Sequence, residues 1–472
     1  MTVKKRLIAM AITLACMSGV FAKTPPLILA ESKESNSVEK YFDLQEIRDE
    51  NTLGTKIISD TVINSKSRPG KTVRKIELSF TAQNWHGLIL RHPARVYVPV
   101  DYKGGGKAGI IGTERQFFDD PNWSRKKIPG SGRDTEGEYA EGTAIDLNIP
   151  IMIFSNPAED YWGMNESDLM GYALKKAQET KDLTWVGYYP IIKSYLRAIT
   201  LMHSLKGINT EKAVLMGCSK RGLAVSVATG VDPDRVAGTM AACYFGGNNL
   251  YFIARKFAEF GAGVGGGEET MGRPTGPAFQ PADELLREVN NPIGLQILAN
   301  FDPYMWRTKI KAKYLVTLGT NDQLFALGSP NSMMSEMTGD KAFLAVDNFP
   351  HTWVSDKHLA AWRMWLAHTF MGRKVPEINM HVSREHDTLT LQPKINKVNK
   401  LIGVSVFYAY VPLVSDWRKA KWQSAEIPEN GGNFTVELKL KPGNQLAYYI
   451  EVQDEGVGGT GYVSSLVEIV RQ

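Results

Sequence analysis

A serine stands where an apolar strand pattern runs directly into a helical pattern. The segment Gly-Cys-Ser219 has a small residue, Gly217, which lets the chain turn sharply and presents the Ser219 hydroxyl above the carboxyl edge of a sheet. The Lys220 N–H lies at the start of the following helix, where it can donate to a developing oxyanion. Arg221 replaces the usual second glycine, with Gly222 one place later. The pattern predicts nucleophilic catalysis, and an ordinary turn with a serine N-cap is the alternative.

A serine nucleophile needs a base, and the base needs an acid that orients it. Asp322 follows the strand pattern Tyr314–Leu318, and His351 follows the next one, Ala342–Val346. Either residue alone fits a turn or a helix entry. Together with Ser219 they occur in the order Ser, Asp, His, each after its own strand, and this predicts a catalytic triad.

Other residues near the same sheet edge are candidates for binding. By analogy at the level of the fold, we expect the loop after the strand Lys107–Gly112 to supply the second oxyanion donor. Its backbone candidates are Gly112, Thr113 and Glu114, beside Lys220. Candidates for substrate binding are Trp162, Tyr188 and Arg221. The alternative for the aromatic residues is a place in the core.

The sequence lacks the spacings that hold metals or nucleotides. No HExxH, CxxC or calcium-loop pattern occurs, and Gly265–Gly267 lacks the GK[ST] of a phosphate-binding loop. We therefore expect no metal and no cofactor. Cys218 and Cys243 follow adjacent predicted strands, and a disulfide between them stays open because neighbouring parallel strands rarely give good bridge geometry.

Short apolar strands, among them 107–112 and 236–242, alternate with helical periods through residues 71–374. The helix expected over 189–206 has one apolar stripe, formed by Ile192, Tyr195, Leu196, Ile199 and Met202. This alternation predicts a mostly parallel sheet with helices on both faces, and with the serine turn it predicts the α/β-hydrolase fold. Two strand patterns without a helix between them, 73–82 and 88–100, predict an antiparallel start. The stretches 113–145 and 244–300 are interpreted as loops that determine specificity. Residues 376–472 show alternating strands at roughly ten-residue spacing, which predicts a small β-sandwich of the fibronectin or immunoglobulin type.

The first residues read as a targeting segment. Lys4-Lys5-Arg6 precede the apolar run Leu7–Phe21, and a small-x-small pattern ends at Ala22, so residues 1–22 are predicted to be a signal peptide cut after Ala22. Alternatives are a retained anchor and a lipoprotein site at Cys16. We expect an exported protein, periplasmic or secreted. Residues 23–70 are interpreted as an N-terminal leader.

Composition narrows the class of protein. The chain has 472 residues and a net charge of +5, and removal of the signal peptide leaves +2. This excess is too small for a nucleic-acid binder. Three cysteines cannot supply a disulfide framework, so the core must hold the fold. Beyond the signal peptide no apolar run of 18 residues occurs, so no stable membrane span is expected.

The elbow and several other segments resemble the PhoPQ-activated pathogenicity-related protein family. The segments that carry the resemblance are Gly-Cys-Ser219-Lys-Arg-Gly222, 188–198, 144–156, Asp302-Pro-Tyr304, 319–325 and Asn348-Phe-Pro-His351. The resemblance implies an exported protein of α/β-hydrolase-like fold, associated with virulence regulation and antimicrobial-peptide resistance in Gram-negative bacteria. It makes Ser219 the nucleophile, Asp322 the acid and His351 the base. Leu223 departs from the family pattern, which usually has Trp there. The elbow is also similar to that of glucuronoyl esterases.

Three functions fit these observations. The first is an exported serine hydrolase that cleaves an ester or amide through an acyl-enzyme, acting on a small-molecule, peptide or glycan ester. The second is a hydrolase-fold protein that binds or signals without turnover. The third is a carbohydrate esterase whose C-terminal β-domain helps to grip a polysaccharide.

Overall fold

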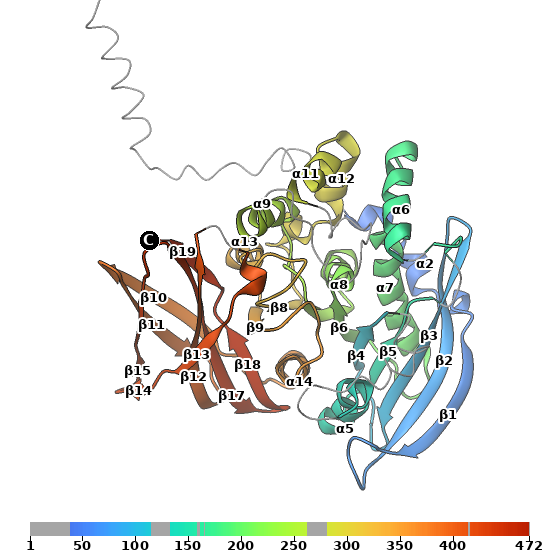
Figure 1. Ribbon diagram of the computed structural model, residues 1–472. Helices are drawn as coiled ribbons and strands as arrows, with labels where there is room; N and C mark the ends of the chain where they lie inside the picture. The colour runs from blue at the N-terminus through green and yellow to red at the C-terminus, as the bar shows by residue number, and fades with distance from the viewer. Residues whose placement is uncertain are drawn as a thin grey trace, which may run out of the picture.

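The structure is a computed structural model that describes residues 38–114, 133–157, 161–164, 166–261, 281–413 and 416–471. The predicted signal peptide and Gly265–Gly267 lie outside the described residues. One twisted sheet runs through the molecule, with helices on both faces (Figure 1). No helix within the described ranges is long and apolar enough to cross a membrane.

The first part of the sheet has the order β1-β2-β3-β5-β4-β6-β7-β8-β9. The pairs from β1 to β5 are antiparallel, as the two adjacent strand patterns predicted, and the pairs from β5 to β9 are parallel. The strands are β1 Lys56–Asn64, β2 Thr72–Trp85, β3 Leu88–Pro99, β4 Lys107–Gly112, β5 Ile151–Phe154, β6 Lys212–Cys218, β7 Val236–Ala242, β8 Lys313–Gly319 and β9 Lys341–Val346.

Helices cover both faces because successive strand residues point to opposite sides. In β4, Ile110 packs into the core beneath α7 and α8, whereas Ile111 packs into the core beneath α5 and α14. The apolar stripe expected on α7 is fully buried, including Ile192, Leu196 and Ile199. The helices of the two faces are α7 Tyr188–Ser204 and α8 Lys220–Val231 on one side, and the π-helix η3 Gly137–Gly142, α5 Thr143–Leu147 and α14 Asp356–Phe370 on the other.

The segment interpreted as a leader is in large part built into the fold. It forms η1 (Val38–Tyr41), α2 (Leu44–Arg48), η2 (Glu50–Thr52) and the edge strand β1. Ile47 is fully buried, and Arg197 in α7 donates to the carbonyls of Glu46, Ile47 and Asp49. Buried apolar anchors and these hydrogen bonds order a stretch whose polar composition resembles that of a linker.

The stretch 244–300 contains helices where the sequence predicted loops. In Figure 1 they gather near the top of the view, with α6 beside them. These helices are short, and they pack against one another and against α6. Because they do not pack on the sheet alone, their sequences lack the regular apolar spacing of a helix that covers a sheet. The helices of this group are α6 Glu166–Thr180, α9 Asn249–Phe260, α11 Ala282–Val289 and α12 Pro292–Phe301.

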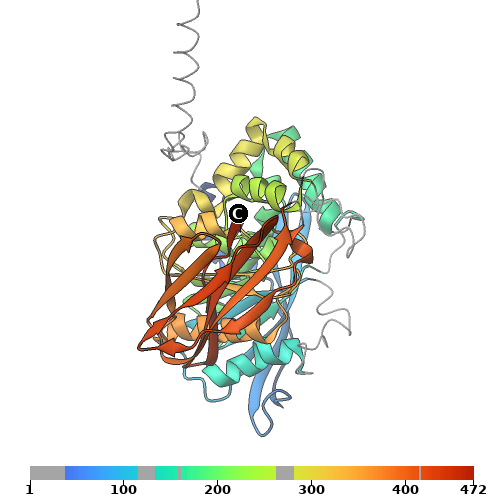
Figure 2. The ribbon, with the colours of Figure 1, turned by 60° about the vertical axis from the view of Figure 1, so that its left-hand side comes forward.

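The C-terminal strands form two further layers. β10, β11 and β16 make a three-stranded sheet that packs on β18, β17, β12 and β13 through a shared apolar core (Figure 2). The second layer continues the main sheet, because Ser464 in β18 pairs with Phe343 in β9. The principal strands are β10 Glu377–Glu385, β11 Thr388–Asn396, β12 Lys400–Pro412, β13 Gln423–Glu426, β16 Val436–Lys439, β17 Asn444–Gly456, β18 Gly459–Ser464 and β19 Glu468–Arg471. The division at residue 375 stays a prediction, and the hydrogen-bonded sheet crosses it.

Candidate active site

Ser219 occupies a strained turn between β6 and α8. Its backbone angles are φ 61° and ψ −123°, in a region that costs a non-glycine residue about 1–3 kcal/mol. The turn is held because the Ser219 N–H donates to Ala242 O at 2.9 Å, and because the Leu223 N–H donates to Ser219 O at 3.1 Å. A Cβ on Gly217 would lie 2.6 Å from the Arg221 carbonyl oxygen, so the turn requires glycine there. Such a conformation lifts the side chain of residue 219 away from the sheet.

Asp322 and His351 are in direct contact after β8 and β9. Asp322 Oδ2 lies 2.7 Å from His351 Nδ1, and both side chains are almost completely buried. The other carboxylate oxygen of Asp322 accepts from the N–H groups of Leu324 and Phe325 at 2.8 and 2.9 Å. The His351 N–H donates to Gln323 Oε1 at 3.0 Å. Both partners are therefore fixed by the backbone, which leaves Nε2 of the ring free to face another group.

The environment of His351 favours its charged form. Burial lowers the pKa of the imidazole, but the charge and hydrogen bond of Asp322 outweigh burial and raise that pKa to about 9. Cys218 and Glu114 add to this rise. An imidazolium that forms during a reaction would thus be stabilised where it stands.

All three predicted residues lie at one edge of the sheet. The strands β6 to β9 are parallel neighbours, so their carboxyl ends, which carry Ser219, Asp322 and His351, meet there. The Phe325 ring packs 5.4 Å from the His351 ring, and Phe325 and Ser219 line the same cavity. The joint action of the three residues as a triad stays a prediction.

The expected oxyanion donors differ in their placement. Lys220 is the first residue of α8, so its N–H lies at the helix N-terminus beside Ser219. The Thr113 N–H instead donates to Phe154 O at 2.8 Å, and Gly112 pairs with Phe154 and Gly217 inside the sheet. The hydrogen-bonded ladder extends one residue further than the sequence indicated, and Thr113 has no free amide for an oxyanion.

The predicted substrate-binding residues are dispersed. The Tyr188 side chain lines the cavity at Ser219, and burial raises the pKa of its hydroxyl to about 12. Trp162 is 43% exposed and lies in an aromatic group with Trp85 and Trp185, away from the residues that line this cavity. Arg221 is buried and ion-paired beneath the elbow.

Glu166 is the partner of Arg221, and no local sequence pattern indicated this pairing. Its two carboxylate oxygens lie 3.2 Å from the Arg221 guanidinium and 3.2 Å from Lys220 Nζ. Asn156 donates to Glu166 at 3.0 Å and also accepts from Arg221. Burial raises the pKa of Glu166, but the two cations outweigh it and lower that pKa to about 2. The network ties the first turn of α8 to α6 and holds the elbow from below.

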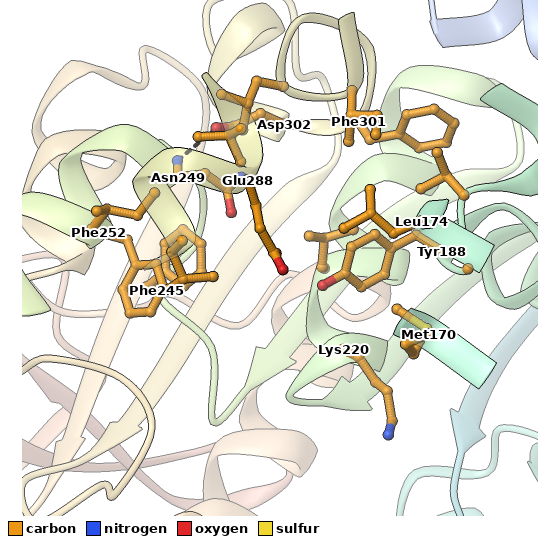
Figure 3. Close-up of a pocket in the computed structure, with 18 of the residues that line it drawn as sticks. Met170, Leu174, Tyr188, Lys220, Phe245, Asn249, Phe252, Glu288, Phe301 and Asp302 are labelled. Carbon is orange, nitrogen blue, oxygen red and sulfur yellow. Dashed lines mark hydrogen bonds between the residues drawn. The ribbon is translucent and has the colours of Figure 1, made fainter. Parts of the chain in front are cut away.

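A cavity of about 190 Å³ opens beside Ser219, between the elbow and the helices α6, α9, α11 and α12. Figure 3 shows aliphatic and aromatic side chains around it, with Glu288 and the Tyr188 hydroxyl directed into the space. The lining residues are Met170, Leu174, Val186, Gly187, Tyr188, Ser219, Lys220, Leu223, Tyr244, Phe245, Asn249, Phe252, Ile253, Leu285, Glu288, Val289, Gly294, Ile297, Leu298, Phe301, Asp302, Leu324 and Phe325.

Cys218 and Cys243 are free thiols in the structure. They are hydrogen-bonded to each other. Burial is the main cause that raises the pKa of the Cys243 thiol, and the hydrogen bond with Cys218 raises it further. The described part of the chain contains no group of three or more His, Cys, Asp or Glu side chains that could hold a metal ion.

The sheet is mixed rather than mostly parallel, since only the pairs from β5 to β9 are parallel. These central parallel strands between helices, the strained serine turn after β6 and the Asp–His pair after β8 and β9 agree with the α/β-hydrolase class of fold. The sequence profile of the PhoPQ-activated pathogenicity-related protein family matches residues 59–248 and 280–418. The chain belongs to that family.

Other similarities are more distant. The autocrine proliferation repressor protein A of Dictyostelium discoideum is 23% identical over 297 residues, which cover 58% of this chain and 55% of that protein, so the chain matches about half of its length. An acetyl xylan esterase from Paenibacillus sp. R4 is similar with a TM-score of 0.44 and 11% identity, over 67% of this chain and 89% of that chain. Candida antarctica lipase A is similar with a TM-score of 0.41 and 12% identity, over 67% of this chain and 82% of that chain.

Proposed function

We propose that the protein is a serine hydrolase that cleaves an ester or amide through an acyl-enzyme. The observation that carries the proposal is the strained Ser219 turn at the same sheet edge as a buried Asp322–His351 pair separated by 2.7 Å. The pairing of the strands requires neither feature. A strained residue and a fixed Asp–His pair are instead what nucleophilic catalysis by a hydroxyl requires.

In this proposal each group has one role. His351 Nε2 takes the Ser219 proton while Oγ attacks the substrate carbonyl, and the Lys220 N–H donates to the oxyanion that forms. Asp322 holds the Nδ1–H of the ring and stabilises the imidazolium. When the carbonyl bond to the leaving group breaks, the imidazolium gives its proton to that group. Water then repeats the sequence on the acyl-enzyme and releases the acid.

We also propose that the protein acts outside the cytoplasm. The support is the charged start, apolar run and small-x-small pattern of residues 1–22, together with the family to which the chain belongs. A role in virulence or in resistance to antimicrobial peptides follows from the family resemblance and is part of the same proposal.

A fluorophosphonate probe tests the proposed chemistry. We expect covalent labelling at Ser219, located by peptide mass spectrometry, and no labelling of the Ser219→Ala variant. Ser335→Ala is a matched control, because Ser335 is exposed in α13 (Pro330–Glu336), and it should label like the parent protein. Folded protein that shows no Ser219-dependent labelling would be a binding or signalling protein instead. Release of acetate from acetylated xylan at a rate far above that from alkyl esters would support a carbohydrate esterase.

A further inference from the structure

The cavity beside Ser219 is lined mainly by apolar side chains, and hydrolysis of an ester or amide does not by itself require such a lining. Leu223 lies one turn beyond Ser219 on α8 and forms one wall. Phe252 from α9 and Ile297 from α12 also line the cavity, so the space lies between the elbow and the helices over the sheet edge. Figure 3 shows the Phe252 ring at the cavity. Burial of an apolar group against such walls is favourable because it removes apolar surface from water.

The most deeply buried carboxylate of the lining is already committed to the protein. Asp302 accepts from the N–H groups of Asn248, Asn249 and Tyr304 at 2.6 to 3.1 Å. The other polar groups that face the cavity are few, chiefly the Glu288 carboxylate and the Tyr188 hydroxyl. A sugar or a peptide bond placed there would bring more polar groups than these two can pair, and each group left unpaired disfavours binding. An alkyl or phenyl group has no such cost.

The position of the cavity indicates which part of the substrate it takes. The acyl group stays bonded to Ser219 Oγ through the acyl-enzyme, whereas the leaving group departs on the side of His351, which protonates it. On the elbow the cavity is lined by Ser219, Lys220 and Leu223. Phe325, whose ring packs against His351, lines it on the histidine side, while His351 itself is not among the described residues that line it. Most of the lining comes from the elbow and from helices α6, α9, α11 and α12 rather than from the loops that carry Asp322 and His351. The space therefore continues from the acyl side of the reacting carbonyl.

We propose that this cavity is an acyl pocket, and that the preferred substrates are esters of medium-chain or phenyl-substituted carboxylic acids. A water molecule occupies about 30 Å³ in the liquid, so a cavity of about 190 Å³ holds much more than an acetyl group. This inference rests on the proposed serine hydrolase function and adds the substrate class to it.

Chain length is the direct test. With p-nitrophenyl esters, which share one leaving group, kcat/KM should rise about fourfold per methylene from acetate to hexanoate, because each buried methylene contributes about 0.8 kcal/mol. Acetate esters of ethanol, butanol and hexanol, which vary the leaving group instead, should differ by less than about threefold. A rise along the alcohol series, with none along the acyl series, would overturn the acyl assignment.

Two substitutions fill the pocket from two different helices, α8 and α12. Leu223→Trp and Ile297→Trp should each lower the ratio of hexanoate to acetate hydrolysis by at least about tenfold. Leu286→Trp is the matched control, because Leu286 is on α11 with 51% of its surface exposed and does not line the cavity, and it should leave the ratio unchanged. An unchanged ratio in both filled variants contradicts the proposal. Because a ratio is measured within one preparation, loss of folded protein does not imitate the effect.

A charged analogue tests the role of the Glu288 carboxylate. The 6-aminohexanoate ester has a chain of the same length with a cationic end, and we expect it to be cleaved at least about tenfold more slowly than hexanoate. Faster cleavage of the amino ester would show that the pocket selects cations and would overturn the apolar assignment.

A phosphonate series separates failure of this inference from failure of the proposed function. Hexyl-phosphonate p-nitrophenyl esters should inactivate faster than methyl-phosphonate esters, with both attached to Ser219. Attachment without a preference for hexyl contradicts the pocket alone. The absence of any attachment contradicts the serine hydrolase.

Discussion

The side chain of Asn348 exchanges two hydrogen bonds with the backbone of Trp422. Its Nδ2 donates to Trp422 O at 3.1 Å, and its Oδ1 accepts from the Trp422 N–H at 2.9 Å. Asn321 makes a related contact, because its Nδ2 donates to the carbonyls of Arg418 and Ala420. Asn321 precedes Asp322, and Asn348 lies three residues before His351. The C-terminal segment 418–422 therefore braces both loops that carry the Asp–His pair.

Asn348→Ala should impair catalysis through this brace. It removes both bonds to Trp422, each worth about 1 kcal/mol, and frees the loop that positions His351. A misplacement on the order of 1 Å can cost about 100-fold in rate, so we expect kcat for a short ester to fall by about 10- to 100-fold with a small change in KM. Steady-state kinetics and chemical denaturation measure the two effects.

Asn433→Ala is the control for that substitution. Asn433 is exposed in the same C-terminal region, and its side chain bonds only within its own turn. Its variant should keep the kcat of the parent protein. Equal kcat values for the Asn348 and Asn433 variants would mean that the brace does not position the loop.

The rate should depend on pH through His351. The base must be neutral to accept the Ser219 proton, and Asp322 raises the pKa of His351 to about 9, so kcat/KM should increase up to about pH 9. Asp322→Asn removes the charge while burial remains, so the pH at which kcat/KM rises should become lower. The maximum value of kcat/KM at high pH should fall by about 10⁴-fold. A pH profile of ester hydrolysis from pH 5 to 10 measures both changes.

The same shift predicts a pH dependence of stability. A histidine with a raised pKa in the folded state contributes stability that is complete below about pH 6.5 and disappears as the pH rises through about 9. Asp322→Asn should remove this dependence. Asp340→Asn, which changes an Asp–His pair remote from the elbow, should not change the pH at which kcat/KM rises. If kcat/KM of the parent protein rises near pH 6.5, and Asp322→Asn does not change that pH, Asp322 does not raise the pKa of a catalytic His351.

The sequence predicted elements well where one apolar face was buried against a neighbour. The bounds of β4 and β7 agree with the continuous apolar runs, and the stripe on α7 is buried as its period indicated. The order of Ser219, Asp322 and His351 was readable because each follows a strand. Such patterns depend on local residue types alone.

The remaining parts depend on contacts that leave no local pattern. Glu166 meets Arg221 across 55 positions, and Asn348 meets the backbone of Trp422 across 74. A bond to a backbone group places no requirement on the type of the residue that supplies it. Thr113 was assigned to the oxyanion hole because its N–H bond to Phe154 cannot be seen in the sequence.

Arg221→Met should destabilise the elbow. It leaves Glu166 with Lys220 and Asn156 only, and breaking a largely buried pair costs on the order of 2 kcal/mol. Because the folded pKa of Glu166 is lowered, the wild-type pair adds stability above about pH 4.5 that is lost as the pH falls toward 2. Urea denaturation should show that the free energy of unfolding falls less between pH 7 and pH 4 in the variant than in the parent protein.

A double variant separates the pair from simple packing. Arg221→Met with Glu166→Gln removes both charges of the pair and leaves only the ammonium of Lys220, which is partly exposed to solvent, without its carboxylate. The double variant should therefore recover at least half of the lost stability. Arg287→Met removes an exposed pair with Asp283 and should cost less than about 0.5 kcal/mol. If the double variant is no more stable than Arg221→Met, the pair does not hold the elbow.

Gly217→Ala should disrupt the turn that presents Ser219. The added Cβ would lie 2.6 Å from the carbonyl oxygen of Arg221 and 2.5 Å from the Tyr195 hydroxyl, and the backbone atom cannot move without distorting α8. We expect a loss of about 1–3 kcal/mol in the free energy of unfolding and at least about 100-fold in kcat. Gly171→Ala is the matched change, because Gly171 is in α6 with open space around its Cβ position, and alanine there should stabilise by about 0.5–1 kcal/mol. Equal behaviour of the two alanine variants in denaturation and in ester hydrolysis would show that the close approach at Gly217 does not maintain the nucleophile's conformation.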